Sequence, residues 1–334
     1  MQTFLSEEAS ALLTYWSIST WFSDGLSLAP GLSITGSAQE GDAVLRTLRN
    51  FCHYPFLMAG ISIAGLKKMS WSYRPTILSF EPNLSKQMAS FLSCSARRGY
   101  LVDASDGFRD YYGPKAIYAG KDLPVDGKLL ASIHVTATAT TAAAQVQPLT
   151  ESTVVSFQNQ LLRYRLKNLV KVENSSFNAP VLPLDMRPTA NALGSCIIDS
   201  PQLQSKLISL LTPVADQRDA DRSASLECVT LEATINLCHE GKTQIFVGEI
   251  ATEVNRIAKA RGERLNYSAE PLGHLLKRVG LFTRRLGKAG KGLVMDLATI
   301  TRVHELAAVY GGAGLDEVEN NLHCPLCTEN KRVM

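Results

Sequence analysis

Two glycines, Gly36 and Gly41, lie between an apolar run and a segment with helical periodicity. Residues 32–35 predict a short strand, and the apolar residues after the glycines recur every three or four positions, at Val44, Leu45, Leu48 and Phe51. A strand, a loop with this glycine spacing and a helix are typical of a phosphate-binding loop, whose backbone amides surround phosphate groups. The pattern therefore predicts an α/β sheet with such a loop after the strand.

The residues that follow the second glycine depart from a working phosphate-binding loop. Asp42 stands where a Lys would neutralise the outer phosphates, and Ala43 where a Ser or Thr would hold Mg²⁺. Two like charges 4 Å apart cost about 1 kcal/mol in water and about 4 kcal/mol near a protein surface. Asp42 would thus repel a triphosphate, and hydrolysis by this chain alone is not expected.

A second segment has the pattern of the metal-side strand of an ATPase. Residues 75–81 form a short apolar run that ends in Glu81, but Phe80 stands where many such ATPases have Asp. We therefore predict a degenerate nucleotide site without catalytic residues, whose remnant is Gly36, Gly41, Asp42, Ala43 and Glu81. The alternative is a buried loop and strand that bind no ligand. No Gly-x-Ser-x-Gly or His-Glu-x-x-His pattern points to another hydrolase.

The element patterns change along the chain. Alternating strands and helices predict a P-loop-like α/β core over residues 1–141, with helices on the sheet faces. Residues 142–222 show helical patterns only and predict a lid or linker, in which the mixed charges of residues 216–222 indicate a solvated hinge. Residues 223–312 predict a winged helix-turn-helix, and residues 313–334 a tail with a Cys-x-x-Cys pattern.

The winged-helix prediction depends on three helical patterns followed by a hairpin. The stripe of Ile250, Val254 and Ile257 marks the middle helix, and Ser268 is placed to cap the next one with its side chain. Two short β runs around the glycine-rich residues 287–292 complete the pattern as a hairpin. His274, beside two apolar positions, is expected to pack or contact backbone rather than read bases.

Basic residues are concentrated in this module. Residues 241–310 contain twelve Lys or Arg and six Asp or Glu, whereas the whole chain carries a net charge of only +3. Such a surplus indicates a surface that holds double-stranded DNA. The residues predicted to contact DNA lie at the end of the third helix and in the wing: Lys277, Arg278, Arg284, Arg285, Lys288 and Lys291. The alternative is a winged helix that docks proteins, with these residues forming a solvated face.

The cysteines bear on the compartment and on metal binding. Seven scattered cysteines favour a reducing compartment over a disulfide framework. No apolar run approaches the length of a membrane span, so a cytoplasmic protein without membrane contact is expected. Cys324 and Cys327 have the spacing of a zinc knuckle, but zinc needs four ligands. His323 can supply a third, and Cys228, Cys238, His239 or a second subunit can complete the site; the alternative is an exposed thiol pair.

Together, residues 36–43, 75–82, 112–120 and 250–296 resemble bacterial and mobile-element P-loop proteins of the helicase-like or primase-associated type, in which a winged helix follows an ATPase core. The resemblance implies a DNA-binding, ATPase-like protein in mobile-element replication or transcriptional control, working as a homo-oligomer or with an active ATPase partner. Family roles in ATP binding carry over to Gly36, Gly41 and Glu81 alone.

Two further functions stay open at this point. One is an active NTPase, with ATP and Mg²⁺ as cofactors, completed by cations from a neighbouring subunit. The cations available for that role are Arg97, Arg98, Lys115 and Lys121. The other is a protein-docking scaffold without nucleic acid.

Overall fold

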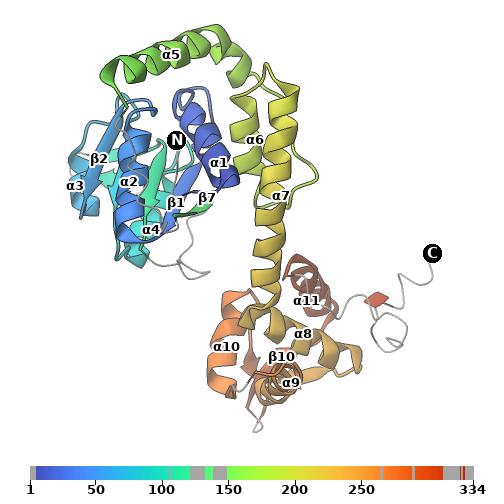
Figure 1. Cartoon of the computed structure of the whole chain (residues 1–334). Helices are drawn as coiled ribbons and strands as arrows, with labels where there is room; N and C mark the ends of the chain where they lie inside the picture. The colour runs from blue at the N-terminus through green and yellow to red at the C-terminus, as the bar shows by residue number, and fades with distance from the viewer. Residues whose placement is uncertain are drawn as a thin grey trace. The chain divides into compact units, whose positions relative to one another are not determined.

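The computed structural model describes residues 5–104, 107–120, 132–137, 149–263, 266–287 and 290–310, together with residues 324, 326 and 327. The chain divides into two compact units, residues 1–215 and residues 216–334 (Figure 1). The predicted boundary between residues 141 and 142 lies outside the described residues. The finer division into four parts therefore stays a prediction.

Unit 1 is built on a parallel sheet of five strands in the order β2-β3-β6-β1-β7. β1 thus lies between β6 and β7, so the chain leaves β1 for the far edge and later returns to both of its sides. This sheet confirms the predicted α/β class with a P-loop-like core. The strands span β1 (Gly31–Gly36), β2 (Pro55–Ala59), β3 (Thr76–Phe80), β6 (Lys115–Tyr118) and β7 (Ser132–Ala137).

Helices cover both faces of this sheet, as two separate groups of buried side chains demonstrate. Leu78 of β3 packs in the core that includes residues of α1 and α2, whereas its neighbour Ile77 packs with residues of α3 and α4. Successive residues of a strand point to opposite faces, so these two groups lie on opposite sides. The helices are α1 (Glu7–Thr20), α2 (Ala38–Arg49), α3 (Ile63–Lys68) and α4 (Lys86–Cys94).

The rest of unit 1 is a small hairpin followed by helices. β4 (Leu101–Ala104) and β5 (Gly107–Asp110) pair antiparallel. Three helices follow the sheet: α5 (Glu151–Glu173), α6 (Arg187–Ser195) and α7 (Pro201–Ser223), whose residues from 216 on belong to unit 2. Arg165 of α5 forms an ion pair with Asp24, which ties that helix to the segment after α1.

Two expectations for residues 1–223 need correction, and one needs refinement. The helix after β1 begins at Ala38 rather than Asp42. Strand β2 was not predicted, because its edge position leaves it partly exposed and its sequence shows no strict alternation. The charged residues 216–222 are helical, since α7 continues through them to Ser223, and the boundary between the two units lies at residues 215 and 216.

Unit 2 has the connectivity of a winged helix-turn-helix, as predicted. Four helices and a three-stranded antiparallel sheet of order β8-β10-β9 enclose one apolar core. The predicted stripe of Ile250, Val254 and Ile257 is buried in that core. The elements are α8 (Leu226–His239), β8 (Gln244–Phe246), α9 (Val247–Ala260), α10 (Ala269–Arg278), β9 (Arg284–Arg285), β10 (Lys291–Val294) and α11 (Leu297–Tyr310).

Helix α10 has Ser268 at its N-cap position, but the serine side chain accepts no hydrogen bond from the first turn, contrary to our expectation. Within the described part of the chain, no helix has the length and apolar character that crossing a membrane requires.

A buried lysine anchors the beginning of β6. The Lys115 ammonium donates to the carbonyl oxygens of Ser95 (2.9 Å), Gly113 (2.7 Å) and Tyr111 (3.3 Å), and it lies over the Trp71 ring. Burial lowers the pKa of Lys115 to about 7, against an opposing effect of Asp110. The ammonium thus links three backbone carbonyl groups in a buried position, so the lysine has a structural role.

We predict that Lys115→Met lowers the free energy of unfolding by about 2–4 kcal/mol, because it removes the buried donor of three hydrogen bonds. Lys68→Met, at an exposed position of α3, should change it by less than about 0.5 kcal/mol. All three tryptophans lie in unit 1, so urea denaturation followed by tryptophan fluorescence reports on this unit. Equal stability of the two variants would contradict the structural role of Lys115.

Candidate functional site

The expected phosphate-binding loop is not formed after β1. Gly36 ends the strand, Ser37 occupies the N-cap, and α2 begins at Ala38, so Gly41 lies inside a helix. Gly36 has a φ of +109°, and a Cβ atom there would collide with the Ala137 backbone of β7. Both glycines are therefore explained by close packing. In parallel sheets, ligands usually bind at the carboxyl ends of the strands, where the strand order reverses. At that place in this sheet, α2 follows β1 directly, without a loop between them.

Aromatic rings fill the edge of the sheet beside Gly41. Tyr118 ends β6, stacks on Phe80 of β3 with ring centroids 4.7 Å apart, and donates a hydrogen bond of 2.8 Å to the Gly36 carbonyl. A Cβ atom on Gly41 would overlap the Tyr118 ring. These contacts occupy the space between β1, β3 and α2 with side chains.

The other residues of the nucleotide-site remnant have local partners. Oε1 of Glu81 accepts hydrogen bonds from the Ile61 amide and the Ser79 hydroxyl, both at 2.8 Å. Asp42 pairs with Arg46 one turn along α2, at 2.6 Å. Glu81 thus connects the segment after β2 to the end of β3, which is a role in folding.

The cations considered for completion by a second subunit are not equally available. Lys115 is buried within its own unit, so it cannot reach a neighbouring subunit. Arg98 donates to the carbonyl groups of Ser23 and Asp24. Arg97 is exposed, and Lys121 lies outside the described residues.

A groove of about 530 Å³ lies in unit 2 between the start of α9, the exposed side of α10 and the wing. Glu270, His274 and Lys277 line it from α10 at a spacing of four and three residues, and Lys291 lines it from β10. Residues four and three positions apart lie on one face of a helix. The exposed position of His274 corrects the expectation that it packs; it faces the groove instead.

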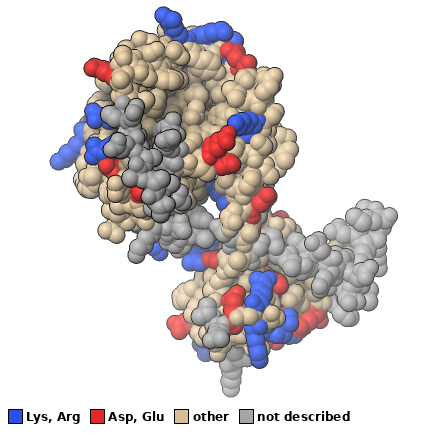
Figure 2. All heavy atoms as spheres, viewed as in Figure 1, with Lys and Arg blue, Asp and Glu red and all other residues tan. Residues whose placement is uncertain are grey.

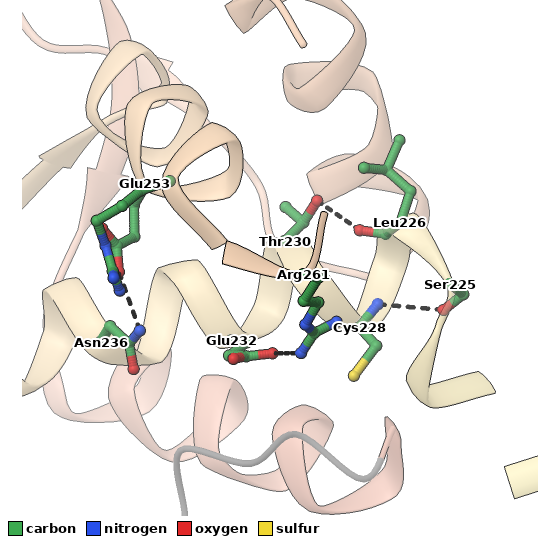
Figure 3. Close-up of polar contacts among 9 residues, drawn as sticks. Ser225, Leu226, Cys228, Thr230, Glu232, Asn236, Glu253 and Arg261 are labelled. Atoms are coloured by element: carbon green, nitrogen blue, oxygen red, sulfur yellow. Dashed lines mark hydrogen bonds and ion pairs between the residues drawn. The ribbon is translucent and has the colours of Figure 1, made fainter. Parts of the chain in front are cut away.

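Many cations of unit 2 are already paired with carboxylates. These pairs lie along α8, α9 and α11, and on the face of unit 2 drawn in Figure 2, basic and acidic side chains lie next to one another. In Figure 3, Glu232 of α8 reaches Arg261 at the end of α9, and Asn236 of α8 donates to Glu253 of α9. The pairs are Lys242 with Glu240 and Glu249, Arg256 with Glu253, Arg261 with Glu232, Arg278 with Glu227, and Arg302 with Glu305.

The cations of the groove and of strand β9 in the wing differ from these. Among the described residues of 241–310, five cations have no ion pair. One is Lys259 of α9, and the other four are Lys277, Arg284, Arg285 and Lys291. Of the six predicted DNA contacts, four therefore carry unpaired charge. Arg278 is held by Glu227 of α8, and Lys288 lies outside the described residues.

Two of these cations lie opposite each other in the wing. Arg285 of β9 and Lys291 of β10 are direct partners in the antiparallel ladder. Like charges at directly opposite positions destabilise a strand pair. Arg284 is close enough to Asp296 to help lower the pKa of that carboxyl, although hydrogen bonds from Thr299 contribute more.

A second cluster, of histidines and cysteines, lies elsewhere in unit 2. One ligand atom each of His239, His304, Cys324 and Cys327 lies within 4.8 Å of all the others. His239 ends α8 and His304 lies in α11, while the cysteines belong to the predicted knuckle. Burial lowers the pKa of His239 to about 4, helped by His304, and burial also lowers the pKa of His304.

The sequence identified only part of this cluster. His239 was among the predicted candidates, whereas His304 was missed because it lies inside a regular helical pattern without a motif. Cys228 is not in the cluster, and Cys238 lies beside Cys324 without belonging to it. His323 lies outside the described residues.

Comparisons with known proteins give limited information. No protein-family model matches the chain, and no curated protein matches it either. Among solved structures, it is similar to Drosophila ORC bound to DNA, with 10% identity over 90% of this chain and 86% of that chain and a TM-score of 0.23.

Two archaeal structures are similar at the same level. The Aeropyrum pernix ORC2 protein in ADPNP–ADP complexes has 10% identity over 91% of this chain and 94% of that chain, with a TM-score of 0.24. Cdc6p from Pyrobaculum aerophilum has 11% identity over 93% of this chain and 94% of that chain, with a TM-score of 0.27. TM-scores this low carry no argument about function, which has to come from the geometry of this chain.

The packing of Gly41 gives a direct test of its role. Gly41→Ala should lower the free energy of unfolding by about 2 kcal/mol, because overlap with Tyr118 outweighs the gain of about 1 kcal/mol in helix propensity. Gly65→Ala in α3 meets only ordinary contacts and should leave the free energy of unfolding unchanged or raise it by up to about 1 kcal/mol. Tryptophan fluorescence during urea denaturation measures both. A stable Gly41→Ala variant would show that Gly41 is free of this contact.

Proposed function

We propose that this protein binds double-stranded DNA through its winged helix and that its ATPase-like core is catalytically degenerate. The observation that carries the proposal is the division of the cations in unit 2. Five of them are paired with carboxylates, namely Lys242, Arg256, Arg261, Arg278 and Arg302. Within the described residues, Lys277 and Lys291 of the groove and Arg284 and Arg285 of the wing have no ion pair. Unpaired cations gathered at one place are the electrostatic mark of a phosphate-binding surface.

The shape of the module supports the same proposal. α10 is the second helix of the helix-turn-helix, and its ten residues span about 15 Å. The major groove, about 12 Å wide, admits a helix of this kind. Glu270, His274 and Lys277 would then face base edges; a carboxylate accepts from cytosine, and a lysine donates to guanine.

The wing would hold the phosphate backbone. The repulsion between Arg285 and Lys291 costs folding energy, and a phosphate between them would remove that cost.

The beginning of α9 offers a second place for a phosphate group. Gly248 lies exposed in the first turn of this helix, where a side chain would meet nothing within 4 Å. Amide groups at a helix N-terminus favour phosphate groups.

The core of unit 1 would act as a scaffold. Tyr118 and Phe80 take up the space beside β1, Asp42 lies on the surface of α2, and Glu81 holds the segment after β2. We further propose a role in mobile-element replication or transcriptional control, as a homo-oligomer or with an active ATPase partner; this part rests on sequence resemblance alone.

The alternatives have different support. An NTPase completed by a second subunit would have to use Arg97 or Lys121, since Lys115 is buried. The docking scaffold has one observation in its favour: Leu162, Leu166 and Val170 form an exposed apolar stripe along α5. It becomes the leading account if the DNA experiment below finds no binding.

The wing can be tested with labelled duplex DNA and fluorescence anisotropy at several salt concentrations. The double variant Arg284→Ala/Arg285→Ala should weaken binding about tenfold or more and reduce the slope of log affinity against log salt by about 2, because two phosphate contacts are lost.

Arg256→Ala is the matched control, since that arginine is exposed in the same unit but paired with Glu253. Its affinity and salt slope should stay near those of the unaltered protein. If the double variant binds as tightly as the control, the wing does not hold the backbone. If the unaltered protein fails to bind even at low salt, the proposed function is wrong.

The degenerate core can be tested by titrating the protein with Mg·ATP in a calorimeter. We expect no saturable heat of binding and no ATP-dependent rise in melting temperature. The reason is that the described structure has no loop between β1 and α2 that could surround phosphate groups. Bound ligand at a hundred times its Kd would stabilise the fold by about 2.7 kcal/mol, which a thermal shift detects readily. Saturable binding, especially with subunit association, would favour the NTPase alternative.

A further inference from the structure

The cluster of His239, His304, Cys324 and Cys327 has the composition of a zinc site. Two thiolates and two imidazoles are a ligand set that structural zinc prefers, whereas Mg²⁺ and Ca²⁺ prefer oxygen ligands. Four protein ligands fill a tetrahedral shell, so the site would be closed and structural rather than catalytic.

The distances between ligand atoms agree with tetrahedral coordination. Zn–S bonds of about 2.3 Å and Zn–N bonds of about 2.0–2.1 Å place sulfur and nitrogen about 3.6 Å apart around one ion. Nε2 of His304 lies 3.3 Å from Sγ of Cys324, and Nε2 of His239 lies 3.5 Å from Sγ of Cys327. In both pairs the Nε2 atom faces the sulfur, so each histidine presents one ring nitrogen to the same space.

The surroundings are those of a site inside a fold. Cys324 is fully buried in the apolar core of unit 2, and Leu326 and Cys327 pack partly buried against that core. The two histidine rings lie with their centroids 5.2 Å apart, on helices that are adjacent in space but far apart in sequence. The ligands thus come from three separate segments.

We propose that His239, His304, Cys324 and Cys327 bind one Zn²⁺ ion, which fastens the Cys-x-x-Cys segment to α8 and α11. This site is distinct from the proposed DNA-binding groove, whose residues lie on α10, the wing and the beginning of α9. Its function is to hold residues 324–327 in the core of unit 2, and it does not depend on the proposed DNA binding.

Cys238 provides the main competing explanation. Its buried side chain hydrogen-bonds Cys324, so a disulfide between the two, or Cys238 in place of a histidine ligand, would also explain a buried Cys324. A disulfide would leave no pair of thiolates for zinc. The zinc proposal therefore requires both tail cysteines to be reduced and Cys238 to be dispensable for metal binding.

The test measures the metal content of the full-length chain. Protein prepared under reducing conditions is saturated with zinc chloride, dialysed against metal-free buffer and analysed by elemental mass spectrometry. We expect about one zinc per chain for the unaltered protein and less than about a tenth of that for Cys324→Ser/Cys327→Ser. Cobalt in place of zinc should give the intense visible absorption of a tetrahedral ion and thiolate charge-transfer bands.

Two single variants assign the ligands. His304→Gln leaves the tail cysteines intact, so a loss of tightly held zinc in this variant would identify α11 as part of the site. Cys238→Ala should retain the zinc, as should Cys228→Ala, a matched control at another buried cysteine of α8. Circular dichroism and tyrosine fluorescence would confirm that each variant is folded, because the tryptophans lie in unit 1 whereas Tyr267 and Tyr310 lie in unit 2.

Several results would overturn the proposal. They are an unaltered chain that holds no zinc after saturation, zinc retained by the double cysteine variant or by His304→Gln, and zinc lost from Cys238→Ala. A Cys238–Cys324 disulfide found by peptide mapping of protein isolated without reductant, with its free thiols alkylated first, would do so as well. Because none of these measurements involves DNA, a failure here is independent of the anisotropy experiment.

Discussion

The contact between the Tyr118 ring and α2 determines how the core of unit 1 is built. Because Gly41 has no side chain, α2 can approach the ring closely, and the tyrosine hydroxyl then reaches the last carbonyl group of β1. The helix consequently starts two residues after the strand ends. A phosphate-binding loop and this contact are mutually exclusive in the described structure, since the loop would need the residues that form the first turn of α2 and the space that the ring fills.

The Lys and Arg residues of unit 2 fall into two groups. Those of one group pair with carboxylates, and those of the other group have no ion pair within the described residues. Arg256 and Arg261 stabilise the helices through carboxylates on α8 and α9, and exposed pairs of this kind contribute up to about 1 kcal/mol each. Arg285 and Lys291, in contrast, are placed where folding alone would not favour them. The count of basic residues could not separate these two groups, because pairing depends on residues distant in the sequence.

Much of the fold could be predicted from the sequence, for reasons visible in particular elements. β1, β3 and β6 are buried apolar runs, and α9 has a regular apolar stripe, so periodicity identified them. The start of α2 was misplaced because Gly-x-x-x-x-Gly is also compatible with a strand that turns directly into a helix. His304 could not be identified as a candidate ligand, since only the tertiary packing of α11 against α8 brings it to the cysteines.

The ion pairs of Lys242, Arg256 and Arg261 also have a kinetic consequence for the proposed DNA binding. Non-specific affinity depends on how many phosphate groups the protein neutralises, and Arg256, Arg261 and Lys242 are already engaged with carboxylates. The protein would then leave random sequence quickly and spend little time at each position while it searches. The time that the protein stays at a particular DNA site would depend on the exposed face of α10. There, Glu270 repels phosphate groups and interacts favourably only with a base that donates a hydrogen bond.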